Sequence, residues 1–148
     1  IASRSMKILI RLLVSSALLA GCSSLTTRTA PQADLGGHRH IFVEHLLTDN
    51  HHIDEMIVGV LKARGYDASS GPLTMLPDGV DAIITYRDRW AWDVKSYLIE
   101  LDLEMHANFT NLPLATGSYH QASAYTKSPA EVVREIVAPL FVRKAAKP

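Results

Sequence analysis

The run Tyr97-Leu98-Ile99-Glu100-Leu101-Asp102-Leu103-Glu104-Met105-His106 decides the fold of this chain. Its odd-numbered positions are all apolar, and its even-numbered positions are mostly charged. Because successive side chains of a strand point to opposite faces, this alternation predicts a strand with one face in the core and the other largely in water. The sequence therefore indicates a sheet that is covered on one side only.

Two amphipathic helices are predicted, one before and one after this strand. The first follows the N-cap candidates Thr48, Asp49 and Asn50 and stops at Gly65, and its apolar positions recur at helical spacing: Ile53, Met56, Ile57, Val60 and Leu61. The second opens with the capping-box sequence 128–131, in which a serine precedes a proline and a glutamate. Its expected buried stripe is Val132, Val133, Ile136, Val137 and Leu140, and Pro139 is expected to bend or end it.

Shorter apolar or β-branched runs predict the remaining strands, at 41–43, 66–69, 80–86 and 118–125. The resulting order, β-α-β-β-β-β-α, predicts an α+β fold: a two-layer α/β sandwich with a mostly antiparallel sheet of four to five strands and two helices on one face. The first β-α-β unit is expected to be a right-handed crossover. Residues 38–148 have the length of a single domain, and no internal repeat is visible.

The charge distribution argues against nucleic acid as a partner. The chain has 148 residues with 15 basic and 15 acidic side chains, but three of the basic ones lie within the first 21 residues, which contain no acid. The remainder carries 12 basic against 15 acidic residues, a net charge of −3. Binding to phosphates needs clustered Lys and Arg, which this body lacks.

The N-terminal region has the organisation of an export signal. Met6 is the expected natural start, so residues 1–5 are interpreted as upstream sequence. Lys7 and Arg11 precede the apolar run 12–20, and nine residues of helix rise only about 13 Å, far less than the roughly 30 Å core of a bilayer. The run is therefore expected to be the core of a signal peptide and not a permanent membrane span.

The four residues Leu19, Ala20, Gly21 and Cys22 follow this run, and at this point the sequence resembles bacterial membrane lipoproteins with a lipobox. The resemblance implies that Cys22 receives a diacylglyceryl group and an N-acyl chain, and that residues 1–21 are removed. Two or three chains give stable attachment, because one acyl chain holds a protein only marginally. This lipid, which makes the membrane a partner, is the only non-protein group expected; no other cofactor is predicted.

Position and surroundings of the anchor also predict where the protein resides. Ser23 and Ser24 stand where the lipoprotein family's inner-membrane retention signal usually has Asp, which favours the outer membrane, with the body facing the periplasm. Residues 22–37 are rich in Ser, Thr, Ala, Pro and Gly and are interpreted as a lipidated flexible tether. The body resembles small periplasmic α/β lipoproteins, including the lipopolysaccharide-assembly lipoprotein, transport-auxiliary lipoproteins and the N-terminal domain of the Tol system's β-propeller protein.

The segment 85–93 is the main candidate for partner binding. Its proposed contact residues are Trp90, Trp92, Arg89 and Asp93, and it resembles a Trp-x-Trp-Asp hairpin of uncharacterised bacterial lipoproteins. In an extended chain the two indoles share a face, and aromatic and Arg side chains are frequent binding anchors. The alternative is that the indoles only close the end of the sheet while the charges pair around a hairpin.

The other clusters of polar residues carry weaker signals. Glu100, Asp102 and Glu104 share one strand face, which is expected to be solvated. Five histidines lie near the start of the domain, but they lack downstream partners at metal-binding spacing, so no metal site is predicted: His38, His40, His45, His51 and His52.

These observations favour a non-enzymatic protein. No nucleophile elbow or phosphate-binding glycine loop is present, and the single cysteine is assigned to the lipid, so no catalytic residue is predicted. The leading hypothesis is a lipid-anchored envelope lipoprotein that serves as a protein-interaction or assembly module with an envelope protein as its partner. Two alternatives stay open: a small-ligand or metal carrier with a cleft between helix and sheet, and a hydrolase. The oligomeric state is also left open.

Overall fold

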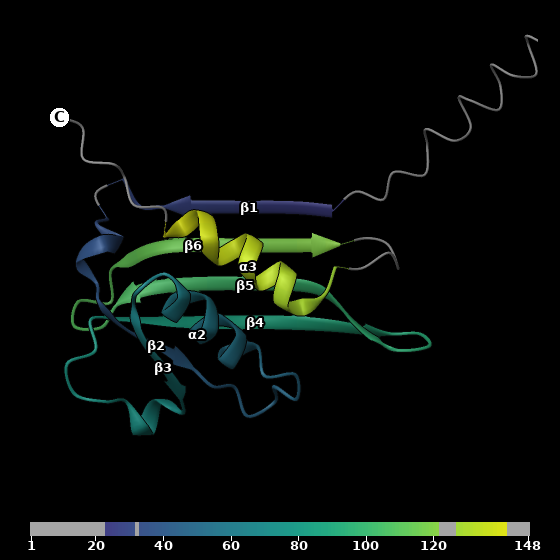
Figure 1. Ribbon diagram of the computed structural model, residues 1–148, viewed down its shortest axis with the longest axis horizontal. Helices are drawn as coiled ribbons and strands as arrows, with labels where there is room; N and C mark the ends of the chain where they lie inside the picture. Colours follow the sequence, from purple (N-terminus) through teal and green to yellow (C-terminus); the bar gives the residue numbers. More distant parts are fainter. Residues whose placement is uncertain (1–22, 32, 122–126, 142–148) are drawn as a thin grey trace, which may run out of the picture.

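The computed structural model describes residues 23–31, 33–121 and 127–141. Figure 1 shows a curved sheet with both helices on the same face. The strands are β1 (Ser23–Thr29), β2 (His40–Glu44), β3 (Asp67–Gly71), β4 (Ala82–Trp92), β5 (Ser96–Ala107) and β6 (Pro113–Gln121). The helices are α2 (Ile53–Ala63) and α3 (Pro129–Leu140), and two 3-10 turns are η2 (Leu35–Gly37) and η3 (Leu73–Met75).

The six strands form one mixed sheet in the order β1-β6-β5-β4-β2-β3. The pairs β1–β6, β6–β5 and β5–β4 are antiparallel, whereas β2 runs parallel to both β3 and β4. The predicted α+β class, the two helices and the order β-α-β-β-β-β-α from β2 onward are confirmed. The sheet is larger and less antiparallel than predicted, since it has six strands with a parallel part.

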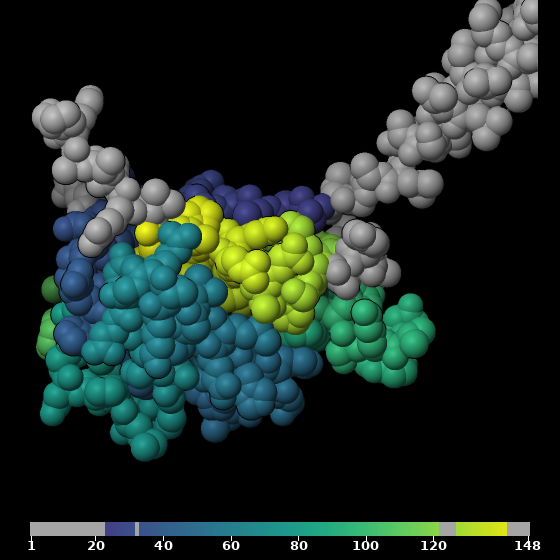
Figure 2. All heavy atoms as spheres, in the orientation of Figure 1, coloured from purple at the N-terminus to yellow at the C-terminus, as the bar shows by residue number. Residues whose placement is uncertain are grey.

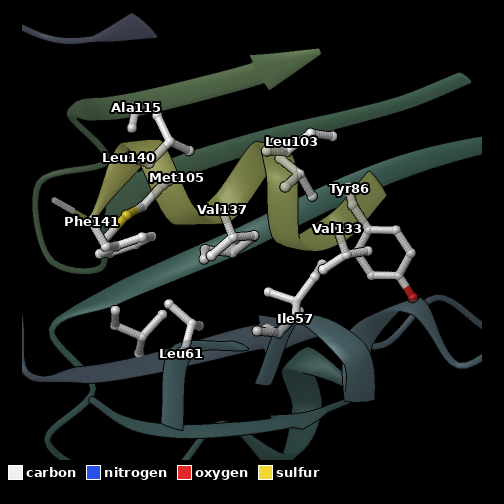
Figure 3. Close-up of a cluster of buried hydrophobic side chains, with 14 of the residues drawn as sticks. Ile57, Leu61, Tyr86, Leu103, Met105, Ala115, Val133, Val137, Leu140 and Phe141 are labelled. Carbon is white, nitrogen blue, oxygen red and sulfur yellow. The ribbon is translucent and has the colours of Figure 1, made fainter. Parts of the chain in front are cut away.

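The main core lies between the helices and one face of the sheet (Figure 3). The predicted apolar stripes of α2 and α3 form the helix side of this core, where Ile57, Leu61, Val133 and Ile136 are fully buried. Ser128 caps α3 as predicted, because its side chain accepts a hydrogen bond from the Glu131 amide at 3.3 Å. Opposite the helices, the sheet contributes the inward side chains of β2, β4, β5 and β6: Ile41, Val43, Ile84, Tyr86, Leu101, Leu103, Met105, Ala115 and Tyr119.

The alternation in β5 is interrupted by one extra residue. Arg89 pairs with Glu100 and Trp90 pairs with Leu98, so Ile99 has no partner on β4. Because of this bulge, the residues of β5 before Ile99 point to the opposite faces of the sheet from those that the alternation predicts. Leu98 is therefore the buried residue, where the sequence pattern predicts Tyr97 and Ile99 instead.

Two segments that the sequence assigns to coil are strands. Ser23–Thr29, inside the predicted tether, pairs along its whole length with β6, and β6 begins at Pro113, five residues before the predicted strand 118–125. Residues 122–125, the end of that predicted strand, lie outside the described residues. Strand β4 also extends to Trp92, beyond the predicted strand end at Tyr86.

The face of the sheet opposite the helices is covered at one end and polar along the rest. Phe42 and Ile83 pack there under Leu76 and Val80 of the segment between β3 and β4. The remainder carries paired charges of β4 and β5, described below. Within the described residues, no helix is long and apolar enough to cross a membrane.

Candidate functional site

The tip of the β4–β5 hairpin projects from one end of the body (Figure 2). The turn between Trp92 and Ser96 is closed by a backbone hydrogen bond of 3.2 Å from the Asp93 amide to the Lys95 carbonyl. Its apolar side chains lie in water, since Trp92 is 77% exposed and Val94 is 92% exposed. Two exposed apolar side chains therefore lie on one turn, at the end of the predicted partner-binding segment.

Trp90 has a different environment from Trp92. Its indole N–H donates a 2.6 Å hydrogen bond to Asp88 Oδ2, and its ring stacks on His51 with centroids 3.5 Å apart and planes inclined by 12°. It is half-buried against the main core. The environment of Trp90 therefore fits the alternative interpretation, in which an indole closes the end of the sheet. Of the two tryptophans, Trp92 is the one that stays exposed for contact with a partner.

Arg89 lies on the opposite face of the hairpin from Trp90, because neighbouring residues of a strand alternate. Its guanidinium contacts Glu100 Oε2 at 2.6 Å on the face without helices. One step along the strands, Arg87 contacts Asp102 at 3.4 Å, and the Ser118 hydroxyl donates to the same carboxylate at 2.6 Å. The structure thus brings Trp92 and Asp93 together at the tip, but it separates Arg89 and Trp90 onto two faces.

The loop before α2 is joined to the base of the hairpin by Asp49. One carboxylate oxygen accepts from the His51 amide, and the other accepts from the Ile53 amide and from the Tyr86 hydroxyl, each at 2.7 Å. Asp49 therefore satisfies amides at the start of α2 although His52, in the left-handed conformation with φ 59°, is the N-cap residue. Burial opposes ionisation, but these hydrogen bonds outweigh it and lower the pKa of Asp49.

Asp49, His51 and Asp88 form a group that the sequence reading missed. One side-chain ligand atom from each lies within 4.8 Å of the others, which is compatible with a shared metal ion. The three residues come from the α2 loop and from β4, and no spacing pattern in the sequence connects them. The stacking of His51 on Trp90 and the hydrogen bond from Tyr86 to Asp49 bring the two segments together.

The other histidines of the predicted cluster are dispersed and individually paired. His45 Nδ1 lies 3.1 Å from the buried carboxylate of Asp54, and His52 lies 3.3 Å from Glu55. His40 contacts Asp67 at 3.0 Å. His38 contacts the carbonyl oxygen of residue 34 through its Nδ1 at 2.9 Å. The histidines that are close in sequence do not converge on a common point.

The lipobox residues Leu19, Ala20, Gly21 and Cys22 lie outside the described residues. Ser23, the residue that follows Cys22 in the sequence, is the first residue of β1 and pairs with Gln121 at the end of β6. Figure 1 shows that β1 begins at the end of the sheet from which the β4–β5 hairpin projects. The start of β1 and the hairpin tip are thus at the same end of the fold (Figure 1).

Comparison with known proteins gives a fold relationship without a family. No protein family model and no curated protein matches the chain. The chain is similar to the PelC dodecamer from Paraburkholderia phytofirmans, with a TM-score of 0.55 and 10% identity over 80% of this chain and 94% of that one. A variant PelC dodecamer from the same organism gives a TM-score of 0.61 and 11% identity over 82% and 100% of the two chains. Identities this low show a common fold alone.

Proposed function

We propose that this chain is a non-enzymatic lipoprotein of the bacterial cell envelope, anchored through Cys22 to the outer membrane and facing the periplasm, that binds another envelope component. The observation that carries the proposal is the direct succession of the lipobox cysteine and β1. With only one peptide bond between Cys22 and Ser23, the lipid would be joined to the edge of the sheet without a linker. The domain would then be held at the membrane surface in a restricted orientation.

The anchor is tested by mass spectrometry of the protein purified from the membranes of its native host. We expect a mass that lacks residues 1–21 and includes acyl groups on Cys22. In a Cys22→Ser variant we expect the protein to leave the membrane fraction. A native protein that retains residues 6–21 and a free thiol would contradict the proposal.

The protein partner that we propose is an envelope protein, and a second copy of the chain is the first candidate to test. Strands β1 and β3 form the two edges of the sheet and are each paired on one side only. Open edges can pair with another chain. The two PelC structures that are similar to this chain are dodecamers. Native mass spectrometry of the detergent-extracted protein should show an oligomer. A monomer at every concentration would exclude a second copy as the partner and leave a different envelope protein.

A metal carrier is the second candidate function, and the group of Asp49, His51 and Asp88 favours it. One imidazole nitrogen and two carboxylate oxygens suit a divalent transition metal. Asp49 and Asp88 already accept hydrogen bonds in the structure, so a metal would have to share their oxygens. Calorimetric titration with Zn²⁺ should give one site that the Asp88→Asn variant weakens. Absence of binding in the wild-type chain would remove this candidate.

A further inference from the structure

We infer that the tip of the β4–β5 hairpin, residues 92–95, inserts into the surface of the lipid bilayer beside the acyl chains of Cys22. The inference rests on the proposed lipidation and names the partner of the exposed Trp92: the membrane surface and not a protein. Three observations carry it, namely the position of the tip along the strands, the side chains that it exposes, and the contrast with the opposite end of the fold.

The register of the sheet fixes the height of the tip relative to the anchor. One row of paired residues crosses four strands, from Ser24 through His120 and Glu100 to Arg89. Ser23 lies one residue beyond this row, whereas Trp92 lies three residues beyond it in the same direction. At about 3.3 Å per residue, the tip reaches roughly 7 Å further than the start of β1.

The anchor and the tip are also close enough to meet the same patch of membrane. The α-carbon of Cys22 lies about 3.8 Å from that of Ser23, as in any pair of consecutive residues. Three strand spacings separate β1 from β4, which is roughly 14 Å. With the Ser23 end of β1 facing the bilayer, the hairpin extends further in the same direction and would reach the headgroups.

The exposed side chains of the tip suit this environment. Trp92 and Val94 are apolar and are 77% and 92% exposed. Tryptophan favours the interface between headgroups and acyl chains, and a neighbouring lysine such as Lys95 can extend its ammonium group back to the phosphates. Asp93 is the one acidic group of the turn and is exposed. The acyl chains of Cys22 would already give stable attachment. The tip would add a second contact with the bilayer that restricts the orientation of the domain.

The opposite end of the sheet provides a matched comparison. The β5–β6 turn exposes Phe109 to 83% and Leu112 to 59%, so exposed apolar side chains alone do not distinguish the two ends. Strand β5 runs away from the tip toward this turn, which is therefore remote from Cys22 and should remain in water. The location of the anchor is the feature that assigns the bilayer to the Trp92 end.

Spin labels on the full, lipidated chain test this inference. Lipidated Cys22 has no free thiol, so Val94→Cys and Phe109→Cys each offer a single labelling position in a chain with one native cysteine. In vesicles of phosphatidylethanolamine and phosphatidylglycerol, we expect the label at 94 to collide more with oxygen than with a water-soluble nickel chelate, and the label at 109 to show the reverse. Equal, water-like behaviour of both labels would overturn the inference. Dipolar broadening between labels at 94 without preferential collision with oxygen would assign the tip to a second copy and overturn it as well.

A second measurement uses the two native tryptophans. In a Trp90→Phe variant Trp92 is the only indole, and its emission should shift to the blue and lose intensity in vesicles whose acyl chains are brominated. In a Trp92→Phe variant the remaining Trp90 should be unaffected. An intact mass is recorded for each sample: a lipidated chain with unquenched Trp92 contradicts the inference and leaves the proposed function standing, whereas an unmodified Cys22 contradicts both.

Discussion

Gly117 of β6 lies directly under Ile136 of α3, so closely that a β-carbon at position 117 would overlap the Cγ2 methyl group of Ile136. The absence of a side chain at this position lets α3 rest on the sheet, where it contacts β6 and β1. Leu140 lies nearby on the same helix. A single glycine therefore sets the distance between the helix and the antiparallel half of the sheet.

Gly117→Ala should lower the free energy of unfolding by about 1–3 kcal/mol, because an added methyl group in a packed core forces neighbouring side chains or backbone to move. Gly59→Ala is the matched control. Gly59 is exposed in α2 and has open space around its α-carbon, so alanine should raise stability by roughly 0.5–1 kcal/mol through helix propensity. Urea denaturation measures both, and equal effects would contradict this account of Gly117.

Replacing Trp90 and Trp92 with alanine should have unequal effects on stability. Trp90→Ala removes the stacking on His51 and a half-buried ring, and should cost about 2 kcal/mol. Trp92→Ala removes a side chain that is 77% exposed and should change stability by less than about 0.5 kcal/mol. Thermal and urea unfolding distinguish the two, and a similar loss in both variants would mean that Trp92 also has a packing role.

Acid should destabilise the protein partly through Asp49. Hydrogen bonds from Tyr86 and the amides of His51 and Ile53 outweigh burial and hold the pKa of this carboxyl below its ordinary value of 3.8. A lowered pKa in the folded state gives stability that is present above the ordinary pKa and is lost as the pH falls through the folded-state value. We therefore expect urea midpoints to fall steeply below about pH 4.

Asp49→Asn should lower stability at neutral pH, and its urea midpoint should fall less steeply in acid than that of the wild-type chain. Asp78→Asn is the control, since Asp78 is an exposed turn residue. If the urea midpoint of Asp49→Asn falls in acid as steeply as that of the wild-type chain, another carboxyl causes most of the acid destabilisation. Asp81 is the next candidate: hydrogen bonds from the amides of His40 and Arg39 lower the pKa of its carboxyl.

Strong alkali should destabilise the fold through Tyr86. Burial, and then the hydrogen bond to Asp49, raise the pKa of its phenol above the ordinary value of 10.0. A raised pKa gives stability that is complete below the ordinary value and is lost as the pH rises above it. Tyr86→Phe should therefore lower the free energy of unfolding by about 1–2 kcal/mol at neutral pH. As the pH rises above 10, the variant should lose less stability than the wild-type chain does. Tyr97→Phe, at a half-buried position beside the β4–β5 turn, is the control variant, and urea unfolding across this pH range measures both.

The helices and the main core were predictable because their signals are local. The apolar stripes of α2 and α3, together with the cap at Ser128, need only helical periodicity. Strand β1 was missed because an edge strand that is mostly Ser and Thr has no apolar alternation to detect. The outer part of β4 was missed for a related reason, since its charged residues Arg87 and Arg89 are stabilised by partners on β5 that only the folded register supplies.

The candidate site shows the same limit. The exposed Trp92 was within the predicted segment, but the separate role of Trp90 depends on His51, which is distant in sequence. The bulge at Ile99, which decides whether Leu98 or its neighbours enter the core, also depends on a pairing between strands. Sequence periodicity predicts which residues share a surface. Tertiary contacts between distant segments decide which of those residues touch one another.

The pairing of β1 with β6 joins the first described strand to the last one. A chain that is synthesised from its N-terminus delivers β1 first, yet β6, the partner of β1, emerges only after the other strands. The meander of β4, β5 and β6 can form from neighbouring segments, while this closing contact has to span the longest loop and is expected to come late in folding. Until then the polar N-terminal strand remains without its partner strand.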